Sequence, residues 1–529
     1  MTGVKRLVLI GFERIESGFD GIFGPQWNPL YSLGALGWFF YWIVAVSGIY
    51  VYIFFDSGVH QAYESVEYMT HVQWYAAGVM RSLHRYASDA LVVVVMCHLF
   101  REYITDRYKD ARWFAWFTGV PLLWFIYASG ISGYWVVWDK LAQYVAIVTS
   151  EWLDTLPIFG EPIARNFLHE SVLSGRFFTL MVFIHIAVPL ILLFAMWIHI
   201  QRHMHPRVNP PRGLAIGSLA MMLVLSLIYP AVSQEPANLN QVPAVVRLDW
   251  FYLPLYPLLD EYPGLWIWAA VGFLTLLLAI WPWLTPRRRE EPATVDLHNC
   301  NGCGRCAADC PFSAIRMLPR SDDTSYEQEA VVDATKCVSC GICAGACPTA
   351  TPYRRRTELI PGIDLPQASI AGLREATLAA LQTLTDGTKV MVYGCRTGPD
   401  LDSLRGEGVA AIALPCLGNL PPSFIDFIIS RRLADGVFLT GCREGDCFYR
   451  LGQEWTDQRL SEQRDPRLRQ RVPRERVLVC WAGLDRRRRL AQELQAFRER
   501  LGELGSQRRT ARVPQSQAPP SAVEVPSNA

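Results

Sequence analysis

The chain has 529 residues, of which 51% are hydrophobic and 12% aromatic, and its formal net charge is +1 at pH 7. This length is enough for several domains, and the hydrophobic content is high for a wholly soluble protein. The near-neutral net charge gives no nucleic-acid signature, so no nucleic-acid partner is expected.

Residues 1–30 are expected to form an amphipathic segment at a membrane surface. The stretch RLVLIGFERIESGFDGIFG, residues 6–24, mixes apolar and charged side chains as an interfacial helix does. No cleavable signal peptide is expected, because Lys5 and Arg6 precede only a short apolar run and acidic residues follow.

Six apolar stretches follow, and each is a predicted transmembrane helix. They cover approximately residues 31–55, 78–103, 113–137, 176–202, 213–232 and 264–284. Acidic residues dominate the first, third and fifth loops, whereas arginine and lysine dominate the second and fourth loops and follow the sixth stretch. The positive-inside rule therefore predicts that both termini lie in the cytoplasm.

Two pairs of histidines lie in the second and fourth stretches, His84 with His98 and His185 with His199. Fourteen positions separate the members of each pair, a spacing that returns to nearly the same helix face after a rise of about 21 Å. Facing imidazoles predict two stacked bis-histidine b haems, one between His84 and His185 near the outer face and one between His98 and His199 near the inner face. The alternative is four satisfied polar residues between helices.

Three segments, RSLHRYASDALVVVVMCHLFREY, SGYWVVWDK and DTLPIFG, resemble the cytochrome b of bc- and bf-type quinol-oxidising complexes. The resemblance covers about residues 10–290. It implies a haem-binding four-helix bundle over residues 31–210, two further helices with a quinone-site-like loop over 211–290, membrane quinone as substrate, and a homodimer as in those complexes. It also implies close approach of helices or a porphyrin at three glycines, Gly34, Gly48 and Gly133.

The resemblance also suggests roles for polar residues, each with a simpler alternative. Arg81 is a candidate partner of a haem propionate, or an arginine that anchors a helix end. RLDWFYLPLY resembles the family's Pro-Glu-Trp-Tyr motif, but Asp249 follows Leu248 where that family has Glu after Pro. Asp249 is a candidate proton acceptor in an outer quinone pocket, or part of an acidic interfacial loop.

Two further features bear on the quinone pockets. The family's Pro-Trp pair is Val137-Trp138 in this chain, so the outer pocket is expected to be altered or inactive. His203 and His205 are candidates for an inner quinone site, or simply lie among lipid headgroups.

Thirteen of the fourteen cysteines lie between Cys300 and Cys480, and eight of them fall in residues 291–356. They form two runs of Cys-x2-Cys-x2-Cys-x3-Cys-Pro, the spacing of a bacterial two-cluster ferredoxin. Such spacing favours clusters in a reducing compartment over disulfides; paired zinc sites are the alternative. One predicted [4Fe–4S] is held by Cys300, Cys303, Cys306 and Cys347, and the second by Cys337, Cys340, Cys343 and Cys310.

Residues 357–505 alternate predicted strands and helices, which indicates a small parallel α/β domain. The expected strands are KVMVYGC, VAAIALPC, GVFLTGC and RVLVCW, and each carries a cysteine at or near its carboxyl end, where such sheets place ligands. A fifth cysteine, Cys447, follows in GCREGDCFYRLG. The tail at 506–529 is rich in Ser, Pro and Gln and is expected to be disordered.

This α/β segment resembles the small iron–sulfur subunit of methyl-viologen-reducing hydrogenases, and the resemblance implies a [2Fe–2S] cluster. The residues that match its ligands are Cys395, Cys416, Cys442 and Cys447. That family often has two cysteines near the first position, where this chain has one. Cys480 is a reserve ligand or an ordinary buried thiol.

These features predict a multi-domain fold: an all-α membrane bundle, an α+β dicluster ferredoxin and a small parallel α/β domain. The expected function is quinone-linked electron transfer in the cell's inner membrane, with the clusters on the cytoplasmic side and a cytoplasmic flavoprotein or heterodisulfide-reductase-like partner. No Gly-x-Gly-x-x-Gly motif opens a strand–helix unit, and no nickel–iron site is apparent. The alternatives are a bc-type subunit that oxidises quinol at an outer site with a separate high-potential acceptor, and a redox-sensing membrane scaffold.

Overall fold

The chain divides into two compact units. The first comprises residues 1–290 with the short stretches 310–314 and 333–338, and the second comprises the remainder. The structure is a computed structural model, and it describes residues 3–109, 112–158, 163, 173–200, 207–241, 243, 245–285, 290–355, 359–384, 387–443, 445–483 and 486–510.

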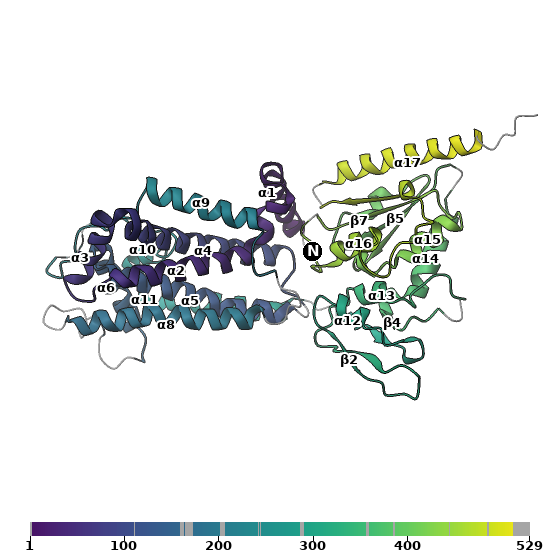
Figure 1. Ribbon diagram of the computed structural model, residues 1–529. Helices are drawn as coiled ribbons and strands as arrows, with labels where there is room; N and C mark the ends of the chain where they lie inside the picture. The colour runs from purple at the N-terminus through teal and green to yellow at the C-terminus, as the bar shows by residue number, and fades with distance from the viewer. Residues whose placement is uncertain are drawn as a thin grey trace, which may run out of the picture. The chain divides into compact units, whose positions relative to one another are not determined.

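The first unit is built from long helices joined by short ones (Figure 1). The long helices are α1 (Gly3–Phe23), α2 (Leu33–Phe54), α4 (Val79–Ile104), α5 (Trp113–Val137), α6 (Lys140–Asp154), α8 (Gly175–Ile200), α9 (Arg212–Ile228) and α11 (Gly264–Leu284). The short ones are η1 (Pro25–Trp27), η2 (Pro29–Ser32), α3 (Gln61–Glu67), η3 (Tyr68–Val72), η4 (Trp74–Gly78) and α10 (Tyr256–Glu261).

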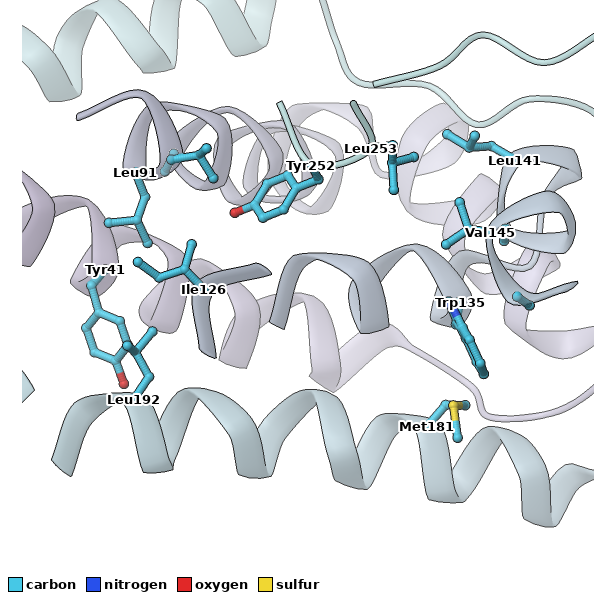
Figure 2. Packing of buried hydrophobic residues seen from close by; sticks show 14 of the residues in the cluster. Tyr41, Leu91, Ile126, Trp135, Leu141, Val145, Met181, Leu192, Tyr252 and Leu253 are labelled. Atoms are coloured by element: carbon cyan, nitrogen blue, oxygen red, sulfur yellow. The ribbon is translucent and has the colours of Figure 1, made fainter. Parts of the chain in front are cut away.

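Four of the long helices share one apolar core. Helix α2 packs along α4 and α5 packs along α8, and side chains from all four join one buried cluster. Figure 2 shows Tyr41 of α2, Leu91 of α4, Ile126 of α5 and Leu192 of α8 gathered in this core. The Tyr41 hydroxyl donates to the Pro189 carbonyl oxygen at 2.9 Å, so this polar group is satisfied in apolar surroundings.

Membrane-length helices account for four of the six predicted spans. Among the described residues, the helices long and apolar enough to cross a membrane are Pro29–Phe54, Trp113–Val137, Gly175–Ile200 and Gly264–Leu284. Helix α4 has 26 residues but includes charged side chains such as Arg85 and Asp89, and α9 reaches only 17 residues. The membrane crossing of α4 and α9 therefore stays a prediction.

Helix α6 lies in the predicted third loop and was missed because it is too short and too polar for a span. Asp139 caps its N-terminus by accepting a hydrogen bond from the Ala142 N–H at 2.8 Å. Leu141 and Val145 of α6 join the bundle core close to Trp135 of α5 (Figure 2). The loop is thus an integral part of the core.

Helix α1 covers most of the predicted N-terminal amphipathic segment. Its Glu16 pairs with Arg101 of α4, with Oε1 and Nε 2.9 Å apart, and both side chains are 4% exposed. Breaking a buried ion pair leaves one charge unpartnered and costs about 3–5 kcal/mol. This pair therefore fixes α1 against the end of α4, one helical turn beyond His98.

The ferredoxin part of the second unit is made of short elements. They are β1 (Thr294–Val295), η6 (Leu297–Asn299), α12 (Arg305–Asp309), β2 (Ile315–Pro319), β3 (Gln328–Val332), α13 (Ile342–Ala346), β4 (Ile363–Asp364) and η8 (Pro366–Ala368). Strands β2 and β3 form an antiparallel hairpin, and β1 pairs with β4. Helices α12 and α13 occupy equivalent places in the two cysteine runs and pack on each other.

The rest of the second unit is an α/β domain around a four-stranded parallel sheet of order β6-β5-β7-β8. Each strand begins within one residue of the predicted start, which confirms the predicted fold class. The elements are α14 (Ile370–Gln382), β5 (Val390–Cys395), η9 (Leu401–Leu404), β6 (Val409–Leu414), η10 (Leu417–Asn419), α15 (Pro422–Ser430), β7 (Gly436–Gly441), α16 (Gly452–Leu460), η11 (Arg474–Arg476), β8 (Val477–Trp481) and α17 (Arg487–Thr510).

Alternating side chains of β5 face opposite sides of this sheet. Val392 packs in the cluster that contains Phe497 of α17. The next residue, Tyr393, turns the other way, and its hydroxyl lies 2.7 Å from Thr377 Oγ1 of α14. Figure 1 shows α17 along one side of the sheet, with α14 and α15 on the other.

Helix α17 continues to Thr510, so the tail predicted from residue 506 begins inside a helix. The remaining residues of that tail, 511–529, lie outside the described residues.

Candidate haem and iron–sulfur sites

The bundle brings the four predicted histidines together as two facing pairs. The ring centroids of His84 on α4 and His185 on α8 are 6.2 Å apart. Two imidazoles on opposite sides of one metal ion, with metal–nitrogen bonds of about 2 Å, have ring centroids about 6.3 Å apart. His98 and His199 lie close enough to interact electrostatically. The first pair therefore has the separation that a shared haem iron requires, and His98 and His199 lie near each other on the same two helices.

Three of the four histidine rings are oriented through Nδ1. In each case Nδ1 lies within hydrogen-bond distance of a carbonyl or hydroxyl oxygen on the neighbouring helix, which leaves Nε2 as the nitrogen available to a metal. The contacts are His84 to Val44 O (2.9 Å) and Ser47 Oγ (3.3 Å), His185 to Ser129 O (3.0 Å) and Ser132 Oγ (3.2 Å), and His199 to Thr118 Oγ1 (3.1 Å).

A glycine faces every one of these rings. A Cβ atom built on the glycine would stand 2.9–3.4 Å from the imidazole Cε1, and at Gly48 and Gly133, both at 2.9 Å, a side chain would displace the ring. The pairs are Gly34 with His98, Gly48 with His84, Gly119 with His199, and Gly133 with His185. Sequence reasoning named three of these glycines and missed Gly119, although it lies fourteen positions before Gly133, the same spacing that separates the histidines.

Replacing Gly133 by valine is expected to release the haem that His84 and His185 would share. A Cβ there would stand 2.9 Å from His185 Cε1, and such overpacking costs about 1–3 kcal/mol even where neighbours relax. Haem content by pyridine haemochrome should fall to about half, because one of two bis-histidine sites is lost. Gly272→Val on α11, where an added Cβ meets nothing within 4 Å, is the matched control and should keep full content. Equal haem in both variants would contradict the role of the glycines.

The structure describes the contacts of Arg81 but not those of the two histidines predicted for the inner quinone site. Arg81 hydrogen-bonds Thr70 and donates to Ser233 Oγ at 2.7 Å, contacts that suit an arginine anchoring a helix end. Its role toward a haem propionate stays a prediction. His203 and His205 lie outside the described residues.

Asp249 lies in a buried polar network next to the His84 turn. Its Oδ2 is 2.6 Å from Arg85 Nη2, and its Oδ1 accepts from the Phe251 N–H at 2.8 Å. The Tyr134 hydroxyl also donates to it. Arg85 in turn pairs with Asp89, with Nη1 and Oδ1 2.7 Å apart. Sequence reasoning missed Arg85, Asp89 and Tyr134, because nothing in the spacing marks three polar side chains from two helices as neighbours.

The first predicted [4Fe–4S] site is supported by the proximity of its four cysteines. Burial, together with the nearby Cys347, Cys303 and Cys300, raises the pKa of the Cys306 thiol to about 12. Thiolates so close together need a positive cluster to balance them, so the donor set fits. For the second set, Cys310, Cys340 and Cys343 are buried and Cys337 is half-buried, and their grouping stays a prediction.

Four thiols of the α/β domain form a closed ring. The pKa of each of Cys395, Cys416, Cys442 and Cys447 is shifted mainly by other thiols of this group, so the four thiols lie close together. The pKa of the Cys442 thiol is lowered because Cys395 and Cys447 donate to it. Cys395, Cys416 and Cys442 come from the carboxyl ends of adjacent parallel strands, the edge where such sheets place ligands. The ring has the donor set of an iron–sulfur cluster held by four cysteine thiolates.

Backbone N–H groups donate to two thiols of this ring, whereas Cys480 lies in the apolar core. The Leu417 N–H donates to Cys395 Sγ at 3.2 Å and the Phe448 N–H to Cys442 Sγ at 3.5 Å, as donors to cluster sulfurs do. Cys480 instead packs on the apolar core beneath α17, which favours the ordinary-thiol interpretation. No group of three His, Cys, Asp or Glu side chains in the described ranges has the geometry of a single-ion site.

Paired histidines across an apolar four-helix bundle define a b-type cytochrome of the membrane. The cytochrome b/b6/petB family model matches residues 20–205. The chain is 30% identical over 166 residues to cytochrome b6 of Porphyra purpurea, covering 30% of this chain and 76% of that protein. The chain belongs to the cytochrome b/b6 family.

The later segments match two other families. The 4Fe-4S dicluster domain model matches residues 299–351, and the methyl-viologen-reducing hydrogenase delta subunit model matches residues 405–505. A solved structure, described as a hyperthermophilic respiratory Complex III, is 22% identical with a TM-score of 0.40, and covers 49% of this chain and 76% of that one. The cytochrome b and dicluster family matches make this a membrane electron-transfer protein with haem b and [4Fe–4S] domains in one chain.

Proposed function

We propose that this protein is a quinone-linked electron-transfer subunit of the inner membrane, which connects a cytoplasmic redox partner to the quinone pool through one [2Fe–2S], two [4Fe–4S] and two b haems. The observation that carries the proposal is the thiol ring of Cys395, Cys416, Cys442 and Cys447 in a chain whose N-terminal part is a cytochrome b. When bound, these groups supply one-electron carriers.

The α/β domain is the proposed entry point for electrons. It resembles a hydrogenase subunit, but no hydride-binding fingerprint or nickel–iron site is apparent in the sequence, so the electron donor is a separate soluble protein. A flavoprotein or a heterodisulfide-reductase-like protein has the required chemistry. As in bc-type complexes, the membrane part is expected to form a homodimer.

The charge pattern of the loops supports the orientation. Arg287, Arg288 and Arg289 directly follow α11, and basic residues also dominate the second and fourth loops. The iron–sulfur segments are therefore proposed to lie on the cytoplasmic side. His98 and His199 would then be nearer to them than His84 and His185, by about the 21 Å rise of fourteen helical residues.

Quinone exchange is proposed to take place at the inner side. The outer candidate, Asp249, is 8% exposed, and its carboxylate is already engaged by Arg85, Tyr134 and the Phe251 N–H. A carboxylate held in this way orders the polypeptide but is poorly placed to accept a proton from quinol. Its function is then to position the loop before α10.

Replacing Asp249 by asparagine is expected to lower quinone reduction by less than about tenfold. A working general base contributes about 10²–10⁴-fold, so a larger loss is expected only if Asp249 accepts the proton. Arg85 keeps its second partner, Asp89, and is not left as an unpaired charge. The measurement is reduction of a short-chain quinone by reduced methyl viologen, with the protein in liposomes.

His199→Leu serves as the comparison and should abolish turnover in the same assay. Haem and iron contents are measured on both variants. If Asp249→Asn stops turnover with all cofactors present, the outer site is the working one, and the bc-type alternative with a separate high-potential acceptor replaces this proposal.

A further inference from the structure

The ferredoxin part and the α/β domain meet at a junction of glycines within the second unit. Gly345 of α13 lies against the backbone carbonyl of Gly418 in η10, and a Cβ on Gly345 would stand only 2.0 Å from that oxygen. A Cβ on Gly418 would stand 2.9 Å from Ile342 Cγ1. Gly341 has φ +77° and lies against the Asn419 side chain. Side chains are thus excluded where α13 and η10 touch, and the two segments pack backbone to backbone.

The proposed cluster ligands flank this junction on both sides. Ile342 is fully buried and lies between Cys340 and Cys343 in the sequence. A Cβ on Gly452, at the start of α16, would meet the Cys416 and Cys447 thiols on one side and Ile342 Cδ1, at 3.7 Å, on the other. Ile342, a residue of the second cysteine run, therefore lies next to the thiol ring.

One buried arginine spans the junction. Arg459 of α16 is 1% exposed, and its Nη1 donates to the Gly418 carbonyl at 2.9 Å. Its Nη2 is 2.6 Å from Asp309 Oδ2 and 3.4 Å from the Ile342 carbonyl. Asp309 immediately precedes Cys310, and Gly418 follows Cys416 by two residues. The guanidinium thus contacts residues within two positions of proposed ligands in both sites.

Asp309, the carboxylate that pairs with Arg459, has further contacts with Arg464 and Trp455. Asp309 is 3% exposed, its Oδ1 accepts from Arg464 Nη1 at 2.5 Å, and its carbonyl accepts from Trp455 Nε1 at 3.1 Å. Arg464 stacks over the Trp455 ring, 3.4 Å from the centroid. A buried Arg–Asp pair is seldom retained for stability alone, because desolvation offsets most of its attraction. Two arginines on one carboxylate also leave a net positive charge there.

We infer that Arg459 is a positioning residue that holds the second cysteine run against the thiol ring, and that its buried charge raises the reduction potentials of both clusters. The inference rests on the proposed function, since it needs a cluster at each place. Reduction adds a negative charge to a cluster, and a nearby buried cation favours the reduced form. The cluster that the second cysteine run would hold, with Cys340 and Cys343 on either side of Ile342 in the sequence, would then exchange electrons directly with the [2Fe–2S].

The exchange is a single-electron transfer. Cys395, Cys416, Cys442 and Cys447 would hold the electron donor, and the second cysteine run would hold the acceptor. The donor would lose one electron and the acceptor would gain it, with no bond broken and no proton moved. A cation shared by both sites shifts both potentials in the same direction, so the step between them stays nearly balanced while the pair as a whole becomes easier to reduce.

Redox titration of the full-length protein, followed by electron paramagnetic resonance, tests this inference. Arg459→Met should lower the midpoint potentials of both clusters, whereas Asp309→Asn should raise them, because it leaves the arginine charge uncompensated. Arg459→Lys keeps the charge and should shift them least. Arg405→Met is the matched control, since Arg405 also pairs with an aspartate but is 58% exposed, and it should leave both potentials unchanged. In the reduced wild type, signals of the two clusters should broaden each other.

The outcomes separate the inference from the proposed function. If the wild-type protein has no [2Fe–2S] signal, the inference about Arg459 and the proposed function are both overturned. If the signals are present but unbroadened, or unshifted in Arg459→Met, only the inference falls. Shifts of the same sign in Arg459→Met and Asp309→Asn would indicate a general packing effect and would also overturn it. If Arg459→Met loses its clusters, Arg459→Lys and Asp309→Asn decide by the same criterion.

Discussion

Replacing His199 by leucine is expected to remove one haem and to stop electron transfer from the clusters to quinone. Leucine supplies no iron ligand and loses the contact between Nδ1 and Thr118 Oγ1 at 3.1 Å. Haem content should fall to about half, since the other bis-histidine site is intact. In the proposed path the remaining haem is about 21 Å farther along the helices, so the loss of turnover should be nearly complete. Pyridine haemochrome and the liposome assay measure the two effects.

His71 offers a control from the same unit. It is 65% exposed and contacts Glu67 one turn earlier in its own segment, so His71→Leu should keep both haems and normal turnover. His84→Leu should halve the haem content as His199→Leu does. Unchanged haem in variants of all four paired histidines would overturn the bis-histidine assignment.

Replacing Cys442 by serine is expected to abolish the [2Fe–2S] signal while the [4Fe–4S] and haem signals persist. Cys442 lies beside the other thiols of the ring and accepts from the Phe448 N–H at 3.5 Å, and a serine hydroxyl is a poorer iron ligand than a thiolate. Electron uptake from the soluble partner should fall in parallel, because the proposed entry point is lost. Low-temperature electron paramagnetic resonance and iron analysis follow the change.

Cys480→Ser is the matched control for this variant. Cys480 lies in the same domain, on β8, but contributes to the core beneath α17 instead of the ring. It should keep the full signal, with at most a modest loss of stability. Loss of the signal in Cys480→Ser and its retention in Cys442→Ser would reverse the ligand assignment.

Periodic features of the sequence predicted most of the architecture. The strands β5 to β8 follow from four short apolar runs, and the histidine pairs from one repeated spacing of fourteen. The same reasoning failed where contacts join residues of no common period. Helix α6 is shorter than a span, and the pairing of Arg85 with Asp249 joins residues 164 positions apart. The only sequence signal for Gly119 is that it precedes Gly133 by fourteen residues, the spacing that also separates Gly34 from Gly48.

The second unit shows the same contrast. The spacing of Cys300, Cys303 and Cys306 predicts a cluster by itself, because local chain geometry sets the positions of the sulfurs. Arg459, in contrast, has no distinguishing neighbours in the sequence. Arg459 and Asp309 are 150 positions apart in the chain, and they meet only because two segments of the second unit pack together.

The burial of the thiol ring constrains how the protein is made. Cys395 is 2% exposed and Cys416 is 1% exposed, so the proposed cluster would have little access to these two thiols once the described part of the domain has folded. Insertion must therefore precede or accompany closure of the loops after β5 and β6, and it must displace thiol protons. Biogenesis would then require a delivery machinery that acts on a partly open polypeptide, and loss of iron–sulfur cluster assembly with haem synthesis intact should yield chains in which the cytochrome part matures while the α/β domain is degraded.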